Sequence, residues 1–273
     1  MKKILVATDF SDAARNAVRY AAGLAQEFNA SLHLLHVFLE PAPALDVPVA
    51  WSDTVEAEQK EKAAQLREEA DNLAASFPVP VTTDVIMGFT GESIADQADK
   101  QGADLVVVGM KGGKHSRFWG SNAITAIRKV SRPVLVVPEE TAFKQPRRIV
   151  FSTDFKETVN YQALDPLVLL AKKFGARIEI VHVQEEAEEM DTGEIAGKMG
   201  LERAFEGIEH QFATIVDDDV EEGIQSFTQN NPTDMLVMVA HHHGLLNRWL
   251  GTSHTKQMSY QTTVPLLVLH DRK

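Results

Sequence analysis

The sequence of 273 residues contains no cysteine, so disulfide bonds are excluded. It also lacks any apolar run that approaches the ~20 residues needed to cross a membrane as a helix. The first apolar run follows two lysines but stops at Asp9, which is too short for a secretory signal. These absences agree with a reducing compartment, and we expect a soluble protein of the cytoplasm.

Basic residues are scarce as well. The sequence has 27 Lys and Arg against 39 Asp and Glu, which gives a formal net charge of −12. Broad binding to nucleic acid or to anionic membrane surfaces requires a net basic surface. The acidic balance therefore argues against both kinds of partner.

The sequence repeats itself. Five segments of the first half return in the second half, in the same order and at a nearly constant offset, which indicates tandem duplication of a unit of roughly 140 residues. We place the two units at residues 1–140 and 146–273. The matched segments are 4–12 with 149–157, 28–30 with 174–176, 36–37 with 182–183, 104–108 with 234–239, and 132–137 with 264–269.

In the first unit, short segments rich in Val and Ile alternate with longer segments of helical periodicity. This alternation predicts an α/β fold, in which a parallel sheet is covered by helices on both faces. Ligands of such sheets bind beyond the carboxyl ends of the strands. The expected strands are 4–8, 31–37, 81–87, 105–108 and 134–137, and the expected helices are 11–28, 53–76, 91–101 and 123–130.

A glycine-rich loop follows the fourth expected strand. Gly109, Gly112 and Gly113 are expected to let the chain turn sharply and approach a ligand closely. The segment 120–122 opens a helix, whose unpaired N–H groups suit an anion. The loop therefore indicates a phosphate site, and the alternative is that its glycines only make a tight turn between strand and helix.

Three separated motifs together resemble those of the universal stress protein family, in its tandem form. They are an Asp at the end of the first strand (Asp9), a His-Val pair at the end of the second (His36-Val37), and a glycine loop, Gly109 to Ser121, that resembles the family pattern Gly-x2-Gly-x9-Gly-[Ser/Thr]. The resemblance covers almost the whole chain. It implies two tandem flavodoxin-like (Rossmann-like) units, each a five-stranded parallel sheet with helices on both faces, packed as a pseudo-dimer.

The resemblance also implies a site for ATP, or for ADP or AMP, in the first unit. Asp9 would lie beside the ribose, and the backbone of Val37 would contact adenine. The glycine loop would wrap the phosphates, with Lys111 as a suitable cation. The loop residues of this expected site are Gly109, Lys111, Gly112, Gly120, Ser121 and Asn122.

One departure concerns the length of that loop. Seven residues separate Gly112 from Gly120, where the family pattern has nine. A shorter loop could still cover a phosphate, or it could leave a triphosphate too exposed to bind. The alternative to a nucleotide-binding protein is therefore a nucleotide-free interaction scaffold that contacts a protein partner.

The second unit is expected to be degenerate and to bind nucleotide weakly or not at all. Ala240 and His243 stand where the first loop has Gly109 and Gly112, and an acidic run, 217–219, would repel phosphate. The segment after Gln184 is acidic and contains three glycines. We interpret that segment either as mobile or as a surface for a partner.

A zinc site at the second unit is a further hypothesis. His241 and His243 alternate along an extended segment and so point the same way, and Asp217 follows a neighbouring strand. The alternative is a solvated polar loop without a metal. A metal or small-molecule sensor is accordingly the third functional alternative.

The leading interpretation is a stress-response protein that binds an adenine nucleotide in its first unit. We expect no dedicated enzyme and at most slow ATP hydrolysis, because no water-activating carboxylate or Walker-type magnesium site is evident. His36 and His182 are interpreted as structural, since no nucleophile accompanies them. A homodimer of two chains is left open.

Overall fold

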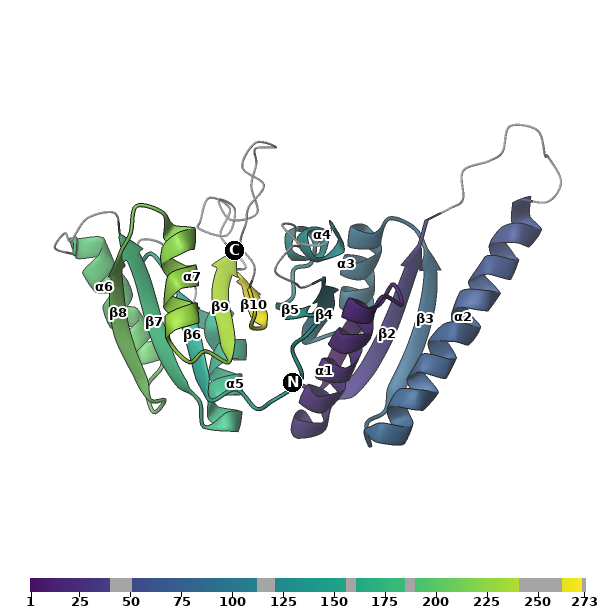
Figure 1. Ribbon diagram of the computed structural model, residues 1–273, viewed down its shortest axis with the longest axis horizontal. Coiled ribbons are helices and arrows are strands. Elements are labelled where there is room, and N and C mark those ends of the chain that lie inside the picture. Colours follow the sequence, from purple (N-terminus) through teal and green to yellow (C-terminus); the bar gives the residue numbers. More distant parts are fainter. Residues whose placement is uncertain (40–50, 112–120, 156–160, 185–189, 241–261, 272–273) are drawn as a thin grey trace. The chain divides into compact units, whose positions relative to one another are not determined.

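The computed structural model describes residues 1–39, 51–111, 121–155, 161–184, 190–240 and 262–271. The side chains of 51–54, 121 and 122 lie outside this description. The described chain divides into two compact units, one ending at Phe143 and the other beginning at Lys144. Each unit is described by itself, as unit 1 and unit 2 (Figure 1).

Unit 1 is a parallel sheet with the strand order β3-β2-β1-β4-β5. The order reverses between β1 and β4, which is the topological switch point where such sheets bind ligands. Its strands are β1 (Lys3–Ala7), β2 (Ser31–Phe38), β3 (Val81–Met87), β4 (Leu105–Met110) and β5 (Val134–Pro138). Its helices are α1 (Asp12–Phe28), α2 (Trp51–Ser76), α3 (Thr90–Lys100) and α4 (Ser121–Lys129).

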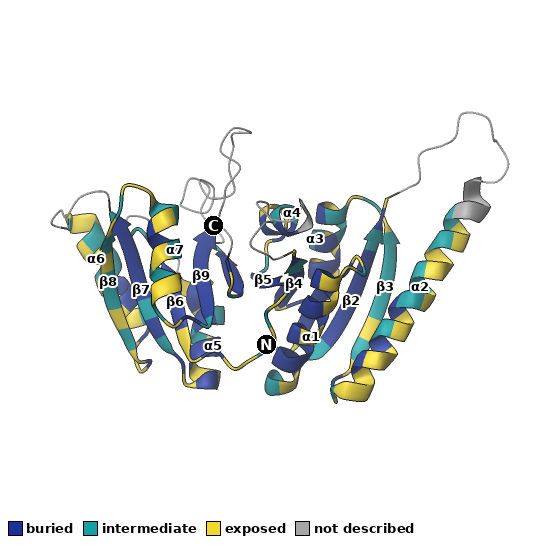
Figure 2. Cartoon of the chain, viewed as in Figure 1, coloured by how far each residue is buried: buried dark blue, intermediate teal, exposed yellow. Residues whose placement is uncertain are grey.

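Helices cover both faces of the sheet of unit 1, as the alternation predicts. α1 and α2 lie on one face, and α3 and α4 pack against each other on the other face (Figure 1). The central strand β1 is buried. β4 is buried as well, whereas the edge strand β3 is only half-buried (Figure 2). Burial on both faces explains why the central strands are continuous runs of Val, Ile and Leu.

α1 begins where the sequence predicts. Ser11 is its N-cap, and the Ser11 Oγ accepts a hydrogen bond from the Ala14 N–H at 3.2 Å. The helix ends at Asn29, which adopts a left-handed conformation with φ 51°. The alanines of one face, together with Val18 and Leu24, are buried against the sheet. Small side chains let this helix lie close to β1 and β4.

Unit 2 repeats the architecture with the strand order β10-β9-β6-β7-β8, again parallel. One difference concerns its first helical segment, where a 3₁₀ turn, η1 (Tyr161–Leu164), precedes α5 (Asp165–Phe174). The remaining helices are α6 (Thr192–Ala204) and α7 (Val220–Asn230). The strands are β6 (Arg148–Ser152), β7 (Arg177–Gln184), β8 (His210–Val216), β9 (Met235–Ala240) and β10 (Leu266–His270). The predicted fold class is confirmed.

A repeated aspartate ties the sheet together in each unit. In unit 1, Asp104 Oδ2 accepts hydrogen bonds from the backbone N–H groups of Lys2 and Lys3. In unit 2, Asp234 Oδ2 accepts them from Arg147 and Arg148, and Asp234 Oδ1 pairs with Lys144 Nζ at 2.7 Å. Burial opposes the ionised form of Asp234, but these donors hold its pKa below the ordinary value. The recurrence of this aspartate is therefore structural.

The glycines after Gln184 lie in a helix, α6. Its N-terminus carries a capping box, in which Asp191 and Glu194 each accept the other's backbone N–H. A Cβ on Gly197 would lie 2.3 Å from the backbone O of Phe155, and a Cβ on Gly200 would overlap the Tyr161 hydroxyl. These two glycines permit close packing of α6 on Phe155 and Tyr161. That the stretch after Gln184 is mobile or binds a partner stays a prediction.

Candidate functional site

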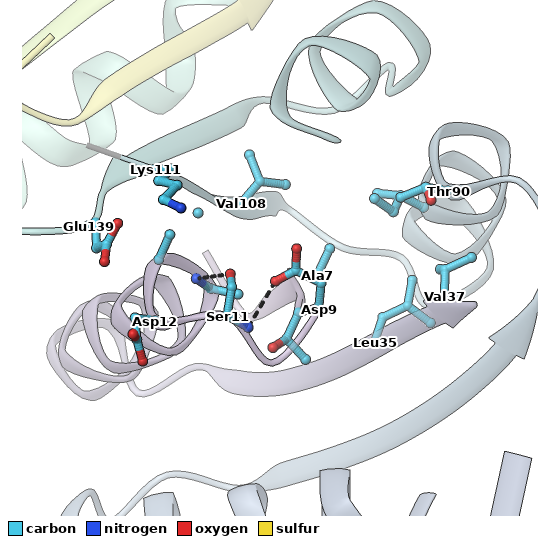
Figure 3. A pocket seen from close by; sticks show the side chains of 15 residues that line it. Ala7, Asp9, Ser11, Asp12, Leu35, Val37, Thr90, Val108, Lys111 and Glu139 are labelled. Carbon is cyan, nitrogen blue, oxygen red and sulfur yellow. Dashed lines mark hydrogen bonds between the residues drawn. The ribbon is translucent and has the colours of Figure 1, made fainter. Parts of the chain in front are cut away.

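A cavity of about 400 Å³ opens at the carboxyl ends of β1, β2 and β4, at the switch point of unit 1 (Figure 3). Asp9, Val37, Gly109 and Lys111, all predicted from the sequence, line it. The other lining residues are Ala7, Thr8, Ser11, Asp12, Ala13, Ala14, Leu35, Thr90, Ile94, Val108 and Glu139. The sequence motifs do not indicate these eleven residues, although the helix expected from residue 11 places the N-terminus of α1 nearby.

The lining residues are sorted by chemistry along the cavity. Leu35, Val37 and Thr90 lie at one end, and Asp12, Lys111 and Glu139 lie at the other (Figure 3). Asp9 and Ser11 lie between them. The cavity therefore has one largely apolar end and one charged end.

Asp9 is held by a strained turn between β1 and α1. Phe10 adopts a left-handed φ of 65°, and its N–H donates to Thr8 Oγ1 at 3.2 Å. Asp9 Oδ1 accepts a hydrogen bond from the Ser11 N–H at 3.1 Å. The same turn occurs in unit 2, where Phe155 has φ 59° and donates to Thr153 Oγ1 at 3.3 Å. This conformation orients Asp9 into the cavity and explains why Thr-Asp-Phe recurs.

His36 supports the same turn. Its Nδ1 lies 2.8 Å from the Thr8 backbone O, and its ring centroid lies 4.4 Å from that of Phe10. In unit 2, His182 Nδ1 lies 3.1 Å from the Thr153 O, and its ring contacts Phe155 at 5.0 Å between centroids. The sequence shows both motifs, and the structure shows that they contact each other. Both histidines have the structural role expected for them.

Gly109 does not turn the chain. It is the fifth residue of strand β4, and a Cβ at this position would lie 2.5 Å from the backbone O of Ala13 and 2.7 Å from the N of Ala14. The expectation that Gly109 starts the loop is therefore wrong. The glycine is required because the first turn of α1 approaches β4 too closely for any side chain.

Side chains of both charges line the end of the cavity where the sequence predicts the phosphates. Lys111 is offset by the carboxylates of Asp12 and Glu139. Gly112 and Gly120 lie outside the described residues. The backbone of Ser121 and Asn122 begins helix α4, as predicted, but their side chains lie outside the described part.

The counterpart of Val37 in unit 2 is the buried Val183. Val37 is half-buried and lines the cavity, whereas the equivalent Val183 is 8% exposed. Gly223 of α7 lies against Val183, because a Cβ on Gly223 would be 3.0 Å from the Val183 Cγ1. Weak nucleotide binding by unit 2 stays a prediction.

The acidic run of unit 2 has a local structural role. Asp219 is the N-cap of α7, and its Oδ1 accepts the N–H groups of Glu221 and Glu222 at 2.8 and 3.2 Å. Asp217 Oδ1 accepts the Asp219 N–H at 3.0 Å. The other residues of the zinc hypothesis, His241 and His243, lie outside the described residues. Within the described ranges, no three His, Asp or Glu side chains gather into a possible metal site.

Two buried histidines of β2 make stability depend on pH. Burial lowers the pKa of His33 and of His36 below the ordinary 6.5. At His36, the Thr8 carbonyl, Asp9 and Glu58 oppose this lowering of the pKa, and Lys62 adds to it. At His33, Asp84 opposes the lowering of the pKa, and Lys3 adds to it. The unfolded chain therefore binds more protons than the folded chain once the pH falls below 6.5.

We accordingly expect full stability above pH 6.5 and a loss as the pH falls through that value. Between about pH 7.5 and pH 5.5, the melting temperature of the wild type should fall more than that of a His33→Asn/His36→Asn variant. Each protein is compared with itself at the higher pH, which removes the packing cost of the substitutions. Equal drops in the two proteins would contradict the assignment.

Comparison with known proteins identifies the family. The sequence model of the universal stress protein family matches residues 1–138 and again residues 146–270. The chain belongs to the universal stress protein family. Its two matches make it a tandem-type member.

The relatives of this universal stress protein include single-unit and two-unit proteins. Universal stress protein MJ0531 of Methanocaldococcus jannaschii is 30% identical over 139 residues, which are 50% of this chain and 81% of that protein. Universal stress protein Slr1230 of Synechocystis is 25% identical over 98% of this chain and 99% of its own length. The latter match extends through both units.

Among solved structures, a universal stress protein from Archaeoglobus fulgidus has a TM-score of 0.75 to this chain at 15% identity. It covers 99% of this chain, and the chain covers 98% of it. At this identity, the likeness shows the fold alone. In the described part of the chain, no helix combines the length and the apolar character that crossing a membrane requires.

Proposed function

We propose that this universal stress protein acts in the cytoplasmic stress response by binding ATP, or a related adenine nucleotide, in the cavity of unit 1. The observation that carries the proposal is the cavity itself. Its position at the switch point, its volume of about 400 Å³ and its lining by Asp9, Val37, Gly109 and Lys111 suit a nucleotide.

The order of residues along the cavity supports one orientation of the nucleotide. Adenine takes the apolar end, where Leu35 and Val37 lie, and the ribose hydroxyls bond to the Asp9 carboxylate (Figure 3). The phosphates then extend toward Lys111. They also meet the N-terminus of α1, whose residues Ser11–Ala14 line the cavity and whose dipole favours an anion.

The number of phosphates decides how much positive charge the site must supply. Asp12 and Glu139 repel phosphate, and among the described lining residues only Lys111 is cationic. Additional cations are present in the sequence of the glycine loop, at Lys114, His115 and Arg117. Affinity for ATP relative to AMP therefore measures what the shortened loop contributes.

Calorimetric titration with ATP, ADP and AMP tests the proposal. We expect one site per chain in the wild type and an affinity at least about tenfold lower in Asp9→Ala, because the ribose loses a charged hydrogen-bond acceptor. Asp154→Ala is the matched control, since Asp154 occupies the equivalent turn of unit 2 and does not line the cavity. It should leave the affinity unchanged.

Two results would overturn the proposal. One is an absence of binding heat for all three nucleotides in the folded wild type. The other is an equal loss of affinity in the two alanine variants, which would place the nucleotide elsewhere.

A further inference from the structure

A second cavity in unit 1 shares no lining residue with the nucleotide cavity. It is a groove of about 390 Å³ between α1 and α2, on one face of the sheet (Figure 1). The lining residues of α2 recur at helical spacing from Gln65 to Ser76. This part of the helix is about 16 Å long. Its volume lies within the range of small-molecule sites.

The groove has an apolar floor and polar walls. Val18 and Leu73, which lie at its floor, are 1% and 6% exposed, and Phe10 and Phe77 contribute aromatic surface. Such a floor suits a flat or aliphatic body of a ligand. The polar residues of the walls are Arg15, Arg19, Gln65, Glu68, Glu69, Asn72 and Ser76.

One carboxylate oxygen of Glu69, a residue of the α2 wall, is buried without a partner. Glu69 Oε2 has no access to solvent and no hydrogen bond among the described residues. An uncompensated buried acceptor is costly, and native proteins rarely leave one. Burial raises the pKa of Glu69, while Arg15 and Arg19 act in the opposite direction. The described protein leaves this carboxylate poorly compensated, and a cation placed against it from the groove would lower that cost.

The two walls carry opposite charge and do not pair with each other. Arg15 and Arg19 line the α1 wall, and Glu68 and Glu69 line the α2 wall. Among the described residues, no ion pair joins an arginine of this groove to a glutamate of it; Arg15 makes only a 3.8 Å contact with Asp12, outside the groove. A molecule with a positive group on one side and a negative group on the other complements both walls.

We propose that this groove binds a small zwitterionic molecule with an apolar body, such as an apolar or aromatic α-amino acid or a close derivative. Its ammonium group pairs with the Glu69 carboxylate on the α2 wall, and its carboxylate pairs with Arg15 and Arg19. Its side chain lies on Val18, Leu73 and Phe77. This proposal does not rest on nucleotide binding, because the two cavities share no lining residue.

Three probes with one shared ring system separate the contributions of the charges. Tryptophan carries both charged groups, tryptamine lacks the carboxylate, and indole-3-propionate lacks the ammonium. Titration followed by saturation-transfer NMR and calorimetry should show saturable binding of tryptophan to the full chain. Each of the two singly charged probes should bind at least about tenfold more weakly.

Matched variants assign the groups. Glu69→Gln should lower the affinity for tryptophan by about tenfold and leave the affinity for indole-3-propionate unchanged. Arg19→Gln should lower the affinity for tryptophan and leave the affinity for tryptamine unchanged. Asp71→Asn, an exposed carboxylate-to-amide change on α2 outside the groove lining, should have no effect. Melting temperatures of all variants establish that they are folded.

The proposal is overturned if the folded wild type binds none of the probes at any soluble concentration. It is equally overturned if the singly charged probes bind as well as tryptophan. If Glu69→Gln and Asp71→Asn have the same affinity for tryptophan, the Glu69 carboxylate has no role in recognition.

Discussion

Replacement of Gly109 by alanine is expected to lower the free energy of unfolding by about 1–3 kcal/mol, the usual cost of overpacking a core. The added Cβ would lie 2.5–2.7 Å from backbone atoms of Ala13 and Ala14, which cannot rotate away as a side chain can. The first turn of α1 must therefore shift. Because this turn lines the nucleotide cavity, adenine-nucleotide affinity should fall by about tenfold or more.

The reciprocal substitution in unit 2, Ala240→Gly, is the matched control. Ala240 is the equivalent residue of β9, and it already carries a Cβ. Removal of this Cβ should change the free energy of unfolding little and leave nucleotide affinity unchanged. Urea unfolding and calorimetry measure both quantities. If Gly109→Ala has the same stability and nucleotide affinity as the wild type, the role assigned to Gly109 is contradicted.

Gly197→Ala is expected to destabilise unit 2 even though alanine is the better helix former. The change gains up to about 1 kcal/mol of helix propensity in α6. It also places a Cβ 2.3 Å from the carbonyl oxygen of Phe155, whose backbone is fixed in the left-handed turn. The steric cost, about 1–3 kcal/mol, should outweigh the gain.

Gly193→Ala separates the two effects within the same helix. A Cβ on Gly193 would meet at nearest the Asp191 Oδ1 at 3.2 Å, so this capping oxygen must shift by only a few tenths of an ångström, whereas at Gly197 the Cβ lies 2.3 Å from a backbone atom. This variant should be as stable as the wild type or more so, and Gly197→Ala should be less stable, in parallel urea titrations. Stabilisation by both alanines would show that α6 does not press on the Phe155 turn. Nucleotide affinity should be unchanged in both, because residues of unit 1 line the cavity.

Periodicity and repetition in the sequence predict the fold well. The apolar runs lie in β1, β4 and β5, and α1 begins next to Ser11 as expected, because these features depend on local pattern and on burial of whole strands. Repetition of the motifs correctly predicts a second unit with the same strand order. Four of the expected site residues, Asp9, Val37, Gly109 and Lys111, line one cavity because parallel strands end at one edge.

The features that the sequence does not reveal depend on contacts between distant segments. Nothing local shows that Gly109 faces Ala13, or that Gly197 faces Phe155, so both glycines resemble turn or linker residues in the sequence. Nor does a phenylalanine indicate a left-handed conformation, which is uncommon for bulky residues. Glu139 and Glu69 line cavities only because elements far apart in the chain pack together.

The central claim, that unit 1 holds an adenine nucleotide, is tested most directly by the nucleotide content of the protein. Freshly purified chain is denatured, and the released small molecules are identified and counted by mass spectrometry. We predict about one adenine nucleotide per chain in the wild type and in Asp154→Ala, and none in Asp9→Ala. Release of no nucleotide from the wild type, together with no thermal stabilisation by added ATP, ADP or AMP, would contradict the claim and favour a nucleotide-free scaffold.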